Sequence, residues 1–363
     1  MKHDWKYIKL GDIISPAKVV RNGANKKFPV LSITMRDGIV FQSSRFKKSI
    51  ASVDTSDYKV VYNGQLVIAF PIDEGLIYTQ DIVDAGIMSP AYNVWNVDFL
   101  EIDRKFLVLY LHCPFSMAYY KSKLRGTTMR RRSMPKEDLL NMPLPVPSFS
   151  VQQSIVSELD KINELIRLKK EQLKDYDNLA QSIFYEMFGD PVVNEKGWEV
   201  KKFADLYKLK SGDSLSAKNF VEGEIPVYGG NGISGYHNDF NMDGDFIIIG
   251  RVGVYCGNVR EVHGKFWLTD NAFQLLYNRE IQYPCFIHYL LEILDLHKYA
   301  NAAAQPVISN LTLKDVEIII PPLPLQQLFA QRIELIEKQK AEIQSTIADL
   351  ETLLASRMQY WFD

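Results

Sequence analysis

The sequence of 363 residues lacks the features that mark membrane proteins and disulfide-rich secreted proteins. No apolar run approaches the roughly 20 residues that a membrane-spanning helix needs. The N-terminus begins with polar residues and has no apolar stretch of the kind that forms a signal peptide. The three cysteines, Cys113, Cys256 and Cys285, lie far apart and in no metal-ligand spacing. We therefore expect a cytoplasmic protein without a disulfide framework, a zinc site or a membrane partner.

Common catalytic motifs are also missing. The sequence contains no phosphate-binding Gly-x-x-x-x-Gly-Lys-Ser/Thr loop, no His-Glu-x-x-His pair and no Asn/Asp-Pro-Pro-Tyr/Phe run of the amino-methyltransferase type. One string, Asp190 followed by Glu199 and Lys201, resembles a metal-dependent nuclease motif, but the plainer interpretation is an exposed strand edge. We favour the plainer interpretation and predict a non-enzyme with no metal site and no cofactor of its own.

What the sequence does contain is a long internal repeat. Residues 147–189 align without a gap with residues 321–363 after a shift of 174 positions, which places Gln152-Gln153 on Gln326-Gln327. In both copies apolar positions recur in alternating steps of four and three residues, the heptad pattern of a coiled coil. The predicted seam positions are Ile155, Leu159, Ile162, Ile166, Lys169, Leu173, Tyr176, Ala180, Ile183 and Met187, and then Phe329, Ile333, Ile336, Lys340, Ile343, Ile347, Leu350, Leu354, Arg357 and Trp361.

Neither helix could bury its seam alone, so we expect the two to pair within one chain. At about 1.5 Å rise per residue each helix would be roughly 50–60 Å long. Lys169 and Lys340 interrupt the seams, and we expect an acidic side chain or a solvated gap beside them.

Four residues predict where the helices begin and end. Ser150, with Gln153 three residues later, suggests a capping box at the start of the first helix. Pro324 suits the first turn of the second helix, and Gly189 should end the first.

The repeat unit is larger than the helix. Residues 5–12 and residues 198–205 both open with Trp and reach Asp seven positions later. Short runs rich in Val, Ile, Tyr and Phe predict strands, and in each globular part a helix should follow them, before a last apolar strand and the proline cluster. The predicted strands are Phe28–Ile33, Gly38–Gln42, Gln65–Phe70, Tyr92–Val97, Ile225–Tyr228, Asp245–Ile249 and Phe273–Tyr277, and the predicted helices are Arg104–Leu124 and Pro284–Leu296.

The order of these parts resembles the specificity subunits of type I restriction-modification systems. The resemblance covers the whole chain and rests on the two Trp-initiated domains, each followed by a proline cluster, a Gln-Gln pair and a long helix ending in Phe-Gly-Asp or Trp-Phe-Asp. It implies an α+β fold in which two globular target-recognition domains alternate with two long helices that pair as an antiparallel intramolecular coiled coil. The predicted segments are recognition domain 1 (1–146), spacer helix 1 (147–190), recognition domain 2 (191–320) and spacer helix 2 (321–363).

The resemblance also implies a function. A subunit of this family would read a bipartite double-stranded DNA target and direct two methyltransferase subunits and the restriction subunits to it. Those partners would use S-adenosylmethionine, ATP and Mg. The methyltransferase subunits would dock on the outer faces of the helices, at positions that include Lys161, Arg167, Lys170, Glu158, Glu164, Glu334, Glu337 and Glu342.

Charge separates the two globular parts. Residues 1–150 hold 21 Lys and Arg against 14 Asp and Glu, whereas residues 191–320 hold 12 against 16. Only the first part has the basic excess of a polyanion binder. A coiled-coil scaffold with two protein-binding β-rich domains and no nucleic-acid role is therefore the alternative, and the acidic second part supports it.

The candidate DNA-binding residues are basic, amide, hydroxyl and aromatic side chains in predicted loops, because arginine and lysine contact phosphates and guanine while Thr hydroxyls contact phosphates. In the first domain they are Lys18, Arg21, Lys26, Lys27, Arg45, Lys47, Lys48, Arg125, Thr127, Thr128, Arg130, Arg131 and Arg132. In the second domain they are Lys210, Lys218, Tyr228, Asn231, Arg251, Tyr255 and Gln305.

Glycines at positions 229, 230, 232 and 235 surround Asn231. They could form a loop whose backbone amides approach phosphate. We favour the alternative of two tight turns that require positive φ.

Overall fold

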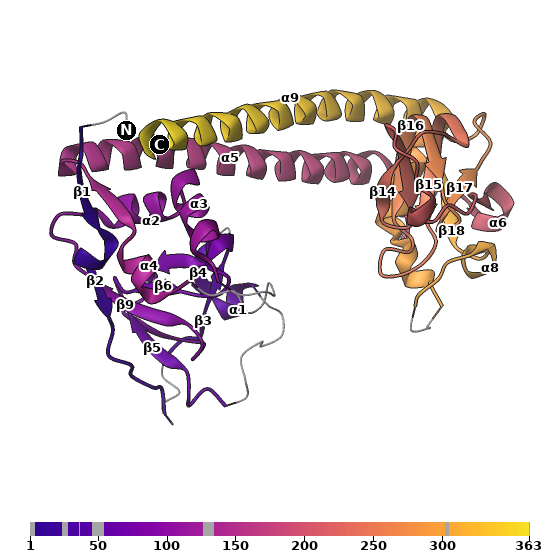
Figure 1. Ribbon diagram of the computed structural model, residues 1–363. Coiled ribbons are helices and arrows are strands. Elements are labelled where there is room, and N and C mark those ends of the chain that lie inside the picture. Colours follow the sequence, from indigo (N-terminus) through magenta and orange to yellow (C-terminus); the bar gives the residue numbers. More distant parts are fainter. Residues whose placement is uncertain are drawn as a thin grey trace. The chain divides into compact units, whose positions relative to one another are not determined.

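The computed structural model describes residues 4–23, 28–35, 37–45, 54–125, 134–301 and 305–362. The chain divides into two compact units. Unit 1 is Met1–Lys169 together with Thr346–Asp363, and unit 2 is Lys170–Ser345. Each long helix is therefore shared, with one half in each unit (Figure 1).

The two long helices are α5 (Phe149–Phe188) and α9 (Leu323–Phe362). In unit 1 the first half of α5 shares a core with the end of α9, where Ile155 and Leu159 join Phe362. In unit 2 the end of α5 meets the start of α9, and the rings of Phe184 and Phe329 lie 5.6 Å apart. The helices therefore run antiparallel, and the predicted fold class is confirmed.

Every seam position predicted from the heptad pattern is buried or half-buried in its unit. The helix ends agree less well with the prediction. α5 begins at Phe149, so Ser150 lies inside the helix and the predicted capping box is wrong. Pro324 is in the first turn of α9 as predicted, and Gly189 ends α5 with φ of 77°.

Unit 1 contains only antiparallel strand pairs among its described residues. A central sheet has the strand order β2-β9-β6-β7, and three two-stranded pairs, β1–β10, β3–β4 and β5–β8, surround it. The strands are β1 (Lys6–Lys9), β2 (Ile14–Pro16), β3 (Leu31–Thr34), β4 (Gly38–Phe41), β5 (Lys59–Tyr62), β6 (Leu66–Ile68), β7 (Ile77–Thr79), β8 (Ala85–Met88), β9 (Asn93–Val97) and β10 (Pro143–Val146). The short helices are η1 (Leu10–Asp12), α1 (Gln42–Arg45), η2 (Ile72–Glu74) and α4 (Lys136–Leu140).

The helix predicted over Arg104–Leu124 is two helices, α2 (Arg104–Leu111) and α3 (Pro114–Lys123). Pro114 lacks an amide hydrogen and its ring would clash with the preceding turn, so one continuous helix is not possible. Pro114 instead takes the first position of α3, and the Cys113 side chain caps that helix.

Unit 2 contains a larger sheet with the strand order β12-β17-β15-β16-β13-β14. All its pairs are antiparallel except β13–β16, and a separate pair β11–β18 lies beside it. The strands are β11 (Glu199–Lys202), β12 (Lys208–Ser211), β13 (Ile225–Gly229), β14 (Gly232–His237), β15 (Met242–Gly250), β16 (Val259–Leu268), β17 (Ala272–Leu276) and β18 (Glu317–Ile320). The short helices are α6 (Phe203–Leu206), η4 (Ala217–Asn219), α7 (Pro284–Leu294), η5 (Leu296–Tyr299) and α8 (Asn310–Leu313).

The two units share a topology that their sequences do not reveal. The order β2-β9-β6-β7 in unit 1 matches β12-β17-β15-β16 in unit 2, and the pair β1–β10 matches β11–β18. The seven predicted strands all lie on observed strands, with shifted ends. The longest strand, β16, was not predicted, because Gly264 and charged residues interrupt its apolar pattern.

One buried glutamine ties each long helix to its unit. Gln152 Nε2 donates to the carbonyls of Glu101 and Pro147, each at 2.9 Å, while its Oε1 accepts from Asp103 N at 2.7 Å. Gln152 is fully buried, and Asp103 is the N-cap of α2, so the contact joins the start of α5 to the start of the domain helix.

The same contact recurs in unit 2. Gln326 Nε2 donates to the carbonyls of Ile281 (3.1 Å) and Pro321 (2.7 Å), and its Oε1 accepts from Tyr283 N at 2.8 Å. Tyr283 is the N-cap of α7. The first glutamine of the repeated Gln-Gln pair is therefore a structural latch.

The tryptophans that open the two domains also contact the long helices. The ring of Trp5 stacks on Trp361 of α9 with centroids 6.4 Å apart, and Trp198 Nε1 donates to Phe188 O, at the end of α5, at 2.8 Å. The repeated Trp motif thus marks the seat of each domain on a helix end.

Candidate nucleic-acid interface

Four loop segments that are far apart in sequence meet in unit 2. Arg251 N donates to Asn271 O at 2.9 Å, and Gly253 N donates to Pro306 O at 2.9 Å. The β13–β14 turn joins them, because a Cβ on Gly230 would lie 3.1 Å from the carbonyl oxygens of Asn271 and Val252. One surface is therefore formed by the turn around Asn231, the β15–β16 connection, the β16–β17 turn and the segment that begins at Gln305, and we call it the loop surface.

The loop surface brings together four of the predicted DNA-binding residues: Asn231, Arg251, Tyr255 and Gln305. Asn231, Tyr255 and Gln305 are exposed, whereas Arg251 is half-buried. The Arg251 guanidinium lies 5.3 Å from the centre of the Phe273 ring and donates to Asp270 O at 3.3 Å. It is thus a fixed cation among exposed polar and aromatic groups, an arrangement suited to a base edge or a phosphate.

Other predicted residues of the second domain lie differently. The ring of Tyr228 packs edge-on against Phe266 at 5.4 Å and is half-buried, so it supports the turn. Lys210 is exposed on β12, which is one edge strand of the sheet, whereas β13 lies next to the opposite edge strand. Lys218 is exposed in η4, and neither lysine is among the residues that build the loop surface.

The glycines around Asn231 are explained mostly by close approach rather than by turns. Only Gly232 among the four has a positive φ, of 97°. A Cβ on Gly235 would come within 2.4 Å of the Phe220 ring, and one on Gly230 would press on two carbonyl oxygens. The expectation of two turns that need positive φ is therefore wrong in its physical reason, except at Gly232.

In unit 1 two of the predicted arginines are held by acids. Arg21 Nη1 lies 2.7 Å from Asp57 Oδ1, and Arg125 Nη2 lies 3.3 Å from Asp138 Oδ2. Lys18 is exposed. The Arg21–Asp57 pair is exposed on both sides, so a phosphate could displace Asp57 at little cost. Asp138 is half-buried and also lies 3.8 Å from Lys123, although Arg125 itself is exposed.

The remaining predicted residues of unit 1 lie outside the part of the chain that the structure describes, or have a side chain that it does not describe. They are Lys26, Lys27, Lys47, Lys48, Thr127, Thr128, Arg130, Arg131 and Arg132, together with the side chain of Arg45. Their assignment to DNA stays a prediction.

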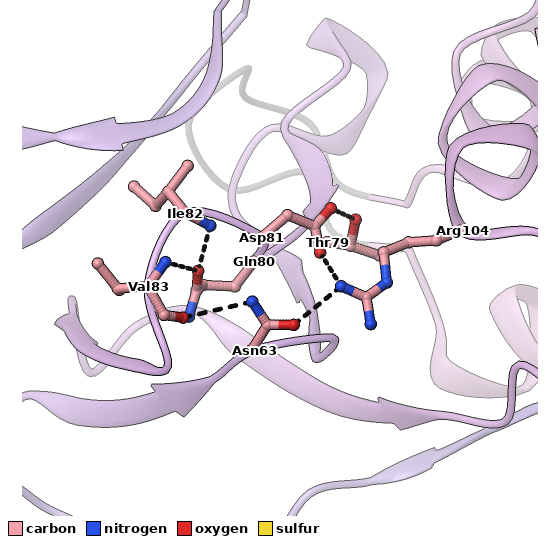
Figure 2. Close-up of polar contacts among 7 residues, drawn as sticks. All are labelled: Asn63, Thr79, Gln80, Asp81, Ile82, Val83 and Arg104. Carbon is pink, nitrogen blue, oxygen red and sulfur yellow. Dashed lines mark hydrogen bonds and ion pairs between the residues drawn. The ribbon is translucent and has the colours of Figure 1, made fainter.

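Sequence reasoning missed a polar network in unit 1 that is centred on Arg104 (Figure 2). Arg104 Nη1 contacts Asp81 Oδ1 at 2.6 Å and Asn63 Oδ1 at 2.9 Å, and Thr79 Oγ1 donates to Asp81 Oδ2 at 2.6 Å. The network joins the start of α2 to the ends of β5 and β7. It assigns Arg104 a structural role, and no spacing in the sequence indicates its partners.

The same close-up shows how the next loop is held (Figure 2). Gln80 is fully buried, its Oε1 accepts from Ile82 N and Val83 N, and its Nε2 donates to Val83 O at 2.7 Å. The side chain takes the place of backbone partners, which fixes the loop between β7 and β8.

The long helices carry different polar contacts in the two units. In unit 1 Arg357 Nε pairs with Glu158 Oε1, and Trp361 Nε1 donates to Glu158 Oε2 at 3.1 Å. These hydrogen bonds, the one from Arg357 foremost, lower the pKa of Glu158. Glu158 is half-buried and pairs with Arg357, which is a seam position of α9, so its expected place on the outer face is wrong.

In unit 2 Lys340 lies between two acids, 2.8 Å from Asp177 Oδ1 and 2.8 Å from Glu337 Oε1. Burial alone would lower the pKa of Lys340, but the hydrogen bonds to the two acids raise it. The expected acidic neighbour is confirmed for this lysine.

The other helix residues expected to dock partners are exposed. They are Lys161, Glu164, Arg167, Lys170, Glu334, Glu337 and Glu342.

The described residues give no support to a metal-dependent nuclease. Lys201 Nζ lies 3.1 Å from Glu199 Oε1 on the exposed strand β11, and no group of three His, Cys, Asp or Glu side chains in the described ranges could hold a metal ion. No helix within those ranges is both long enough and apolar enough to cross a bilayer.

The fold defines a class of protein with two β-rich domains, each packed in its own unit against one part of two long antiparallel helices. A family described as "Type I restriction modification DNA specificity domain" matches residues 2–175 and 195–352. The chain belongs to this family.

Curated relatives agree with this assignment. The chain is 30% identical over 241 residues to the type I restriction enzyme EcoprrI specificity subunit of Escherichia coli, a match that covers 62% of this chain and 58% of that subunit. It is 20% identical over 409 residues to the MjaVIII specificity subunit of Methanocaldococcus jannaschii, with 97% and 92% covered.

Two solved structures share the fold. The S subunit of a type I system from M. genitalium matches with a TM-score of 0.56 at 16% identity, over 100% of this chain and 97% of that one. A chain from work on complex assembly and conformational transition of the type I R-M system matches with a TM-score of 0.61 at 19% identity, over 99% and 97%.

Proposed function

We propose that this chain is the sequence-specific DNA-recognition subunit of a type I restriction-modification complex and catalyses no reaction itself. The observation that carries the proposal is the repetition of one domain structure: the same four-strand order and the same glutamine latch occur in both units. A bipartite DNA target needs two such readers that differ in their loops.

Each domain would read one half of a split double-stranded target through base-edge contacts. The paired helices would set the distance between the half-sites, on the order of one helical turn of DNA, ~34 Å. Base pairs between the half-sites would then be spanned without contact.

The two domains would contribute unequally to the electrostatic attraction of DNA. Residues 1–150 carry a net charge of +7 and would contribute most of the phosphate attraction, whereas residues 191–320 carry −4. The second domain would rely on direct base contacts from its loop surface and on positive charge supplied by its partners.

The partners we propose are two methyltransferase subunits, docked on the exposed outer faces of α5 and α9, and the restriction subunits. The methyltransferases would use S-adenosylmethionine and the restriction subunits ATP and Mg, so this chain would need no cofactor. A repeated chain offers two similar docking faces, which suits two copies of one partner. We also propose a cytoplasmic location, because the partners and the DNA would be found there.

Co-expression of the chain with its methyltransferase subunit, followed by methylome sequencing, tests the proposal. We expect methylation at one bipartite motif with a spacer of fixed length. Gel shift with the same complex should show binding that weakens steeply with salt. Failure to bind duplex DNA at every salt concentration would favour the protein-binding scaffold instead.

A further inference from the structure

The β15–β16 connection in unit 2 exposes an apolar tip. Val254 is 79% exposed and Tyr255 is 49% exposed. Single exposed apolar side chains are common on protein surfaces, so exposure alone indicates nothing. The way in which this loop is built gives the exposure its meaning.

Hydrogen bonds across the loop fix its backbone. Gly250 N donates to Asn258 O at 2.9 Å and Gly257 N donates to Gly250 O at 2.8 Å, which closes the base of the loop. Cys256 N donates to Gly253 O at 3.0 Å, which forms a tight turn around Val254 and Tyr255. The tip is therefore a turn on a closed hairpin.

Neighbouring segments hold the loop from outside. Gly253 N donates to Pro306 O at 2.9 Å, and His297 Nδ1 lies 3.0 Å from Cys256 O, a carbonyl that only accepts. Gly257 has φ of 90°, and a Cβ there would lie 2.5 Å from His297 N. A loop fixed in this way presents its tip with little entropy left to lose on binding.

The equivalent connection of unit 1, between β6 and β7, is also held by a histidine. Gly75 has φ of 77° and lies against His112, whose Nε2 is 2.9 Å from Gly75 O. This loop also exposes an apolar side chain, Phe70, at 46%. One histidine-held hairpin loop is thus part of the common design, while its tip differs between the units.

Resting on the proposed function, we propose that Val254 is a specificity-determining residue that contacts the C5 methyl group of a thymine in the major groove of the second half-site. Valine offers no hydrogen-bonding atom, and the thymine methyl is the apolar feature that distinguishes base pairs in that groove. Arg251 and Tyr255, beside it on the loop surface, supply the polar contacts that fix the register.

Replacement of thymine by deoxyuridine tests the contact, because it removes only the C5 methyl group. The bipartite motif is first obtained by methylome sequencing with the wild-type chain. Purified complexes of the chain with its methyltransferase then bind duplexes in which each thymine of the second half-site is replaced in turn. For wild type we expect one replacement to weaken binding roughly tenfold, within the range of a single wrong base pair. The Val254→Ser complex should bind the two duplexes equally.

Val193→Ser is the matched control, since Val193 is 69% exposed in the same unit but far from the loop in sequence, and it should keep the wild-type preference. A second half-site without A·T pairs, an absence of any deoxyuridine effect in wild type, or a full effect in Val254→Ser would each overturn the inference. If the wild-type chain directs methylation to no bipartite motif, the proposed function itself is refuted.

Discussion

Units 1 and 2 are alike where they hold the helices and unlike where they face solvent. The glutamine latches at Gln152 and Gln326 have the same three kinds of partner, and the central strand order is the same. The net charges of residues 1–150 and 191–320, +7 and −4, have opposite signs. The comparison indicates that the repeat preserves the contacts between each domain and the long helices, whereas the surface charge of the domains differs.

The apolar contacts at the ends of the helices also differ. Phe188, at the end of α5, is fully buried, with ring centroids 4.8–5.4 Å from Phe184, Phe286 and Phe329. Its repeat equivalent is Phe362, which ends α9. Phe188 lies inside a cluster of four aromatic rings, whereas the Phe362 ring lies 5.5 Å from Phe106 and 5.7 Å from Tyr110 and is slightly more exposed.

The largest expected effect tests the difference in packing between Phe188 and Phe362. Phe188→Ala should destabilise unit 2 by about 3–5 kcal/mol, because a large buried ring is removed from a packed cluster. Phe362→Ala should cost unit 1 less, because Phe362 is 7% exposed and its ring has two aromatic neighbours rather than three. Urea unfolding combined with hydrogen exchange resolved by segment measures both. Equal losses would show that the two ends are packed alike.

The next effect tests the likeness of the two latches. Gln152→Ala and Gln326→Ala should each destabilise their own unit by about 1–3 kcal/mol, because an amide and two carbonyls lose their buried partner. Thermal unfolding measures the loss. The neighbouring Gln153 and Gln327 are exposed, so Gln153→Ala and Gln327→Ala should change stability by less than about 0.5 kcal/mol.

The pH dependence of stability should separate the two halves of the helix pair. The lowered pKa of Glu158 means that its contribution is present above its ordinary value of 4.5 and is lost as the pH falls through the folded pKa. The raised pKa of Lys340 means that its contribution is present below 10.5 and is lost as the pH rises through the folded pKa.

Each of these pH effects should amount to less than about 1 kcal/mol, because both pairs reach solvent. Glu158→Gln should remove acid sensitivity from unit 1, and Lys340→Gln should remove alkaline sensitivity from unit 2. Unfolding free energies between pH 3 and pH 11 check both, and a variant that keeps the wild-type profile would contradict the assignment.

The smallest expected effect concerns charge. Lys18→Gln should reduce the slope of log affinity against log salt by about 1 in the assembled complex, if Lys18 contacts a phosphate. Lys218→Gln in the acidic unit is the counterpart, and it should change the slope less. Equal changes would remove the electrostatic distinction between the two units.

Much of the fold could be predicted because its signals are local. The heptad steps placed all the seam positions correctly, and short β-rich runs located seven strands. Pro114 divides the predicted helix Arg104–Leu124 into α2 and α3, although the apolar spacing continues across the proline. β16 is not predicted because Gly264 and charged residues interrupt its alternation of apolar and polar residues.

The candidate site could be predicted only in part. Residue chemistry indicated Asn231, Arg251, Tyr255 and Gln305 one at a time, and the structure brings their loops together. Val254 carries no signal of its own, since its importance depends on a loop closed by distant hydrogen bonds. Arg104 is basic like the predicted DNA-binding residues, and only its contacts with Asp81 and Asn63 show that it is structural.

The sequence by itself determined the two long helices, their seams and the repeated sites of attachment, because helix periodicity and a gapless repeat depend on neighbouring residues alone. The antiparallel pairing within each unit, the common order of the central strands and the convergence of the loop surface were decided by the tertiary structure. These features arise from contacts between residues that are tens to hundreds of positions apart, and no local pattern encodes which distant partner a strand or loop will meet.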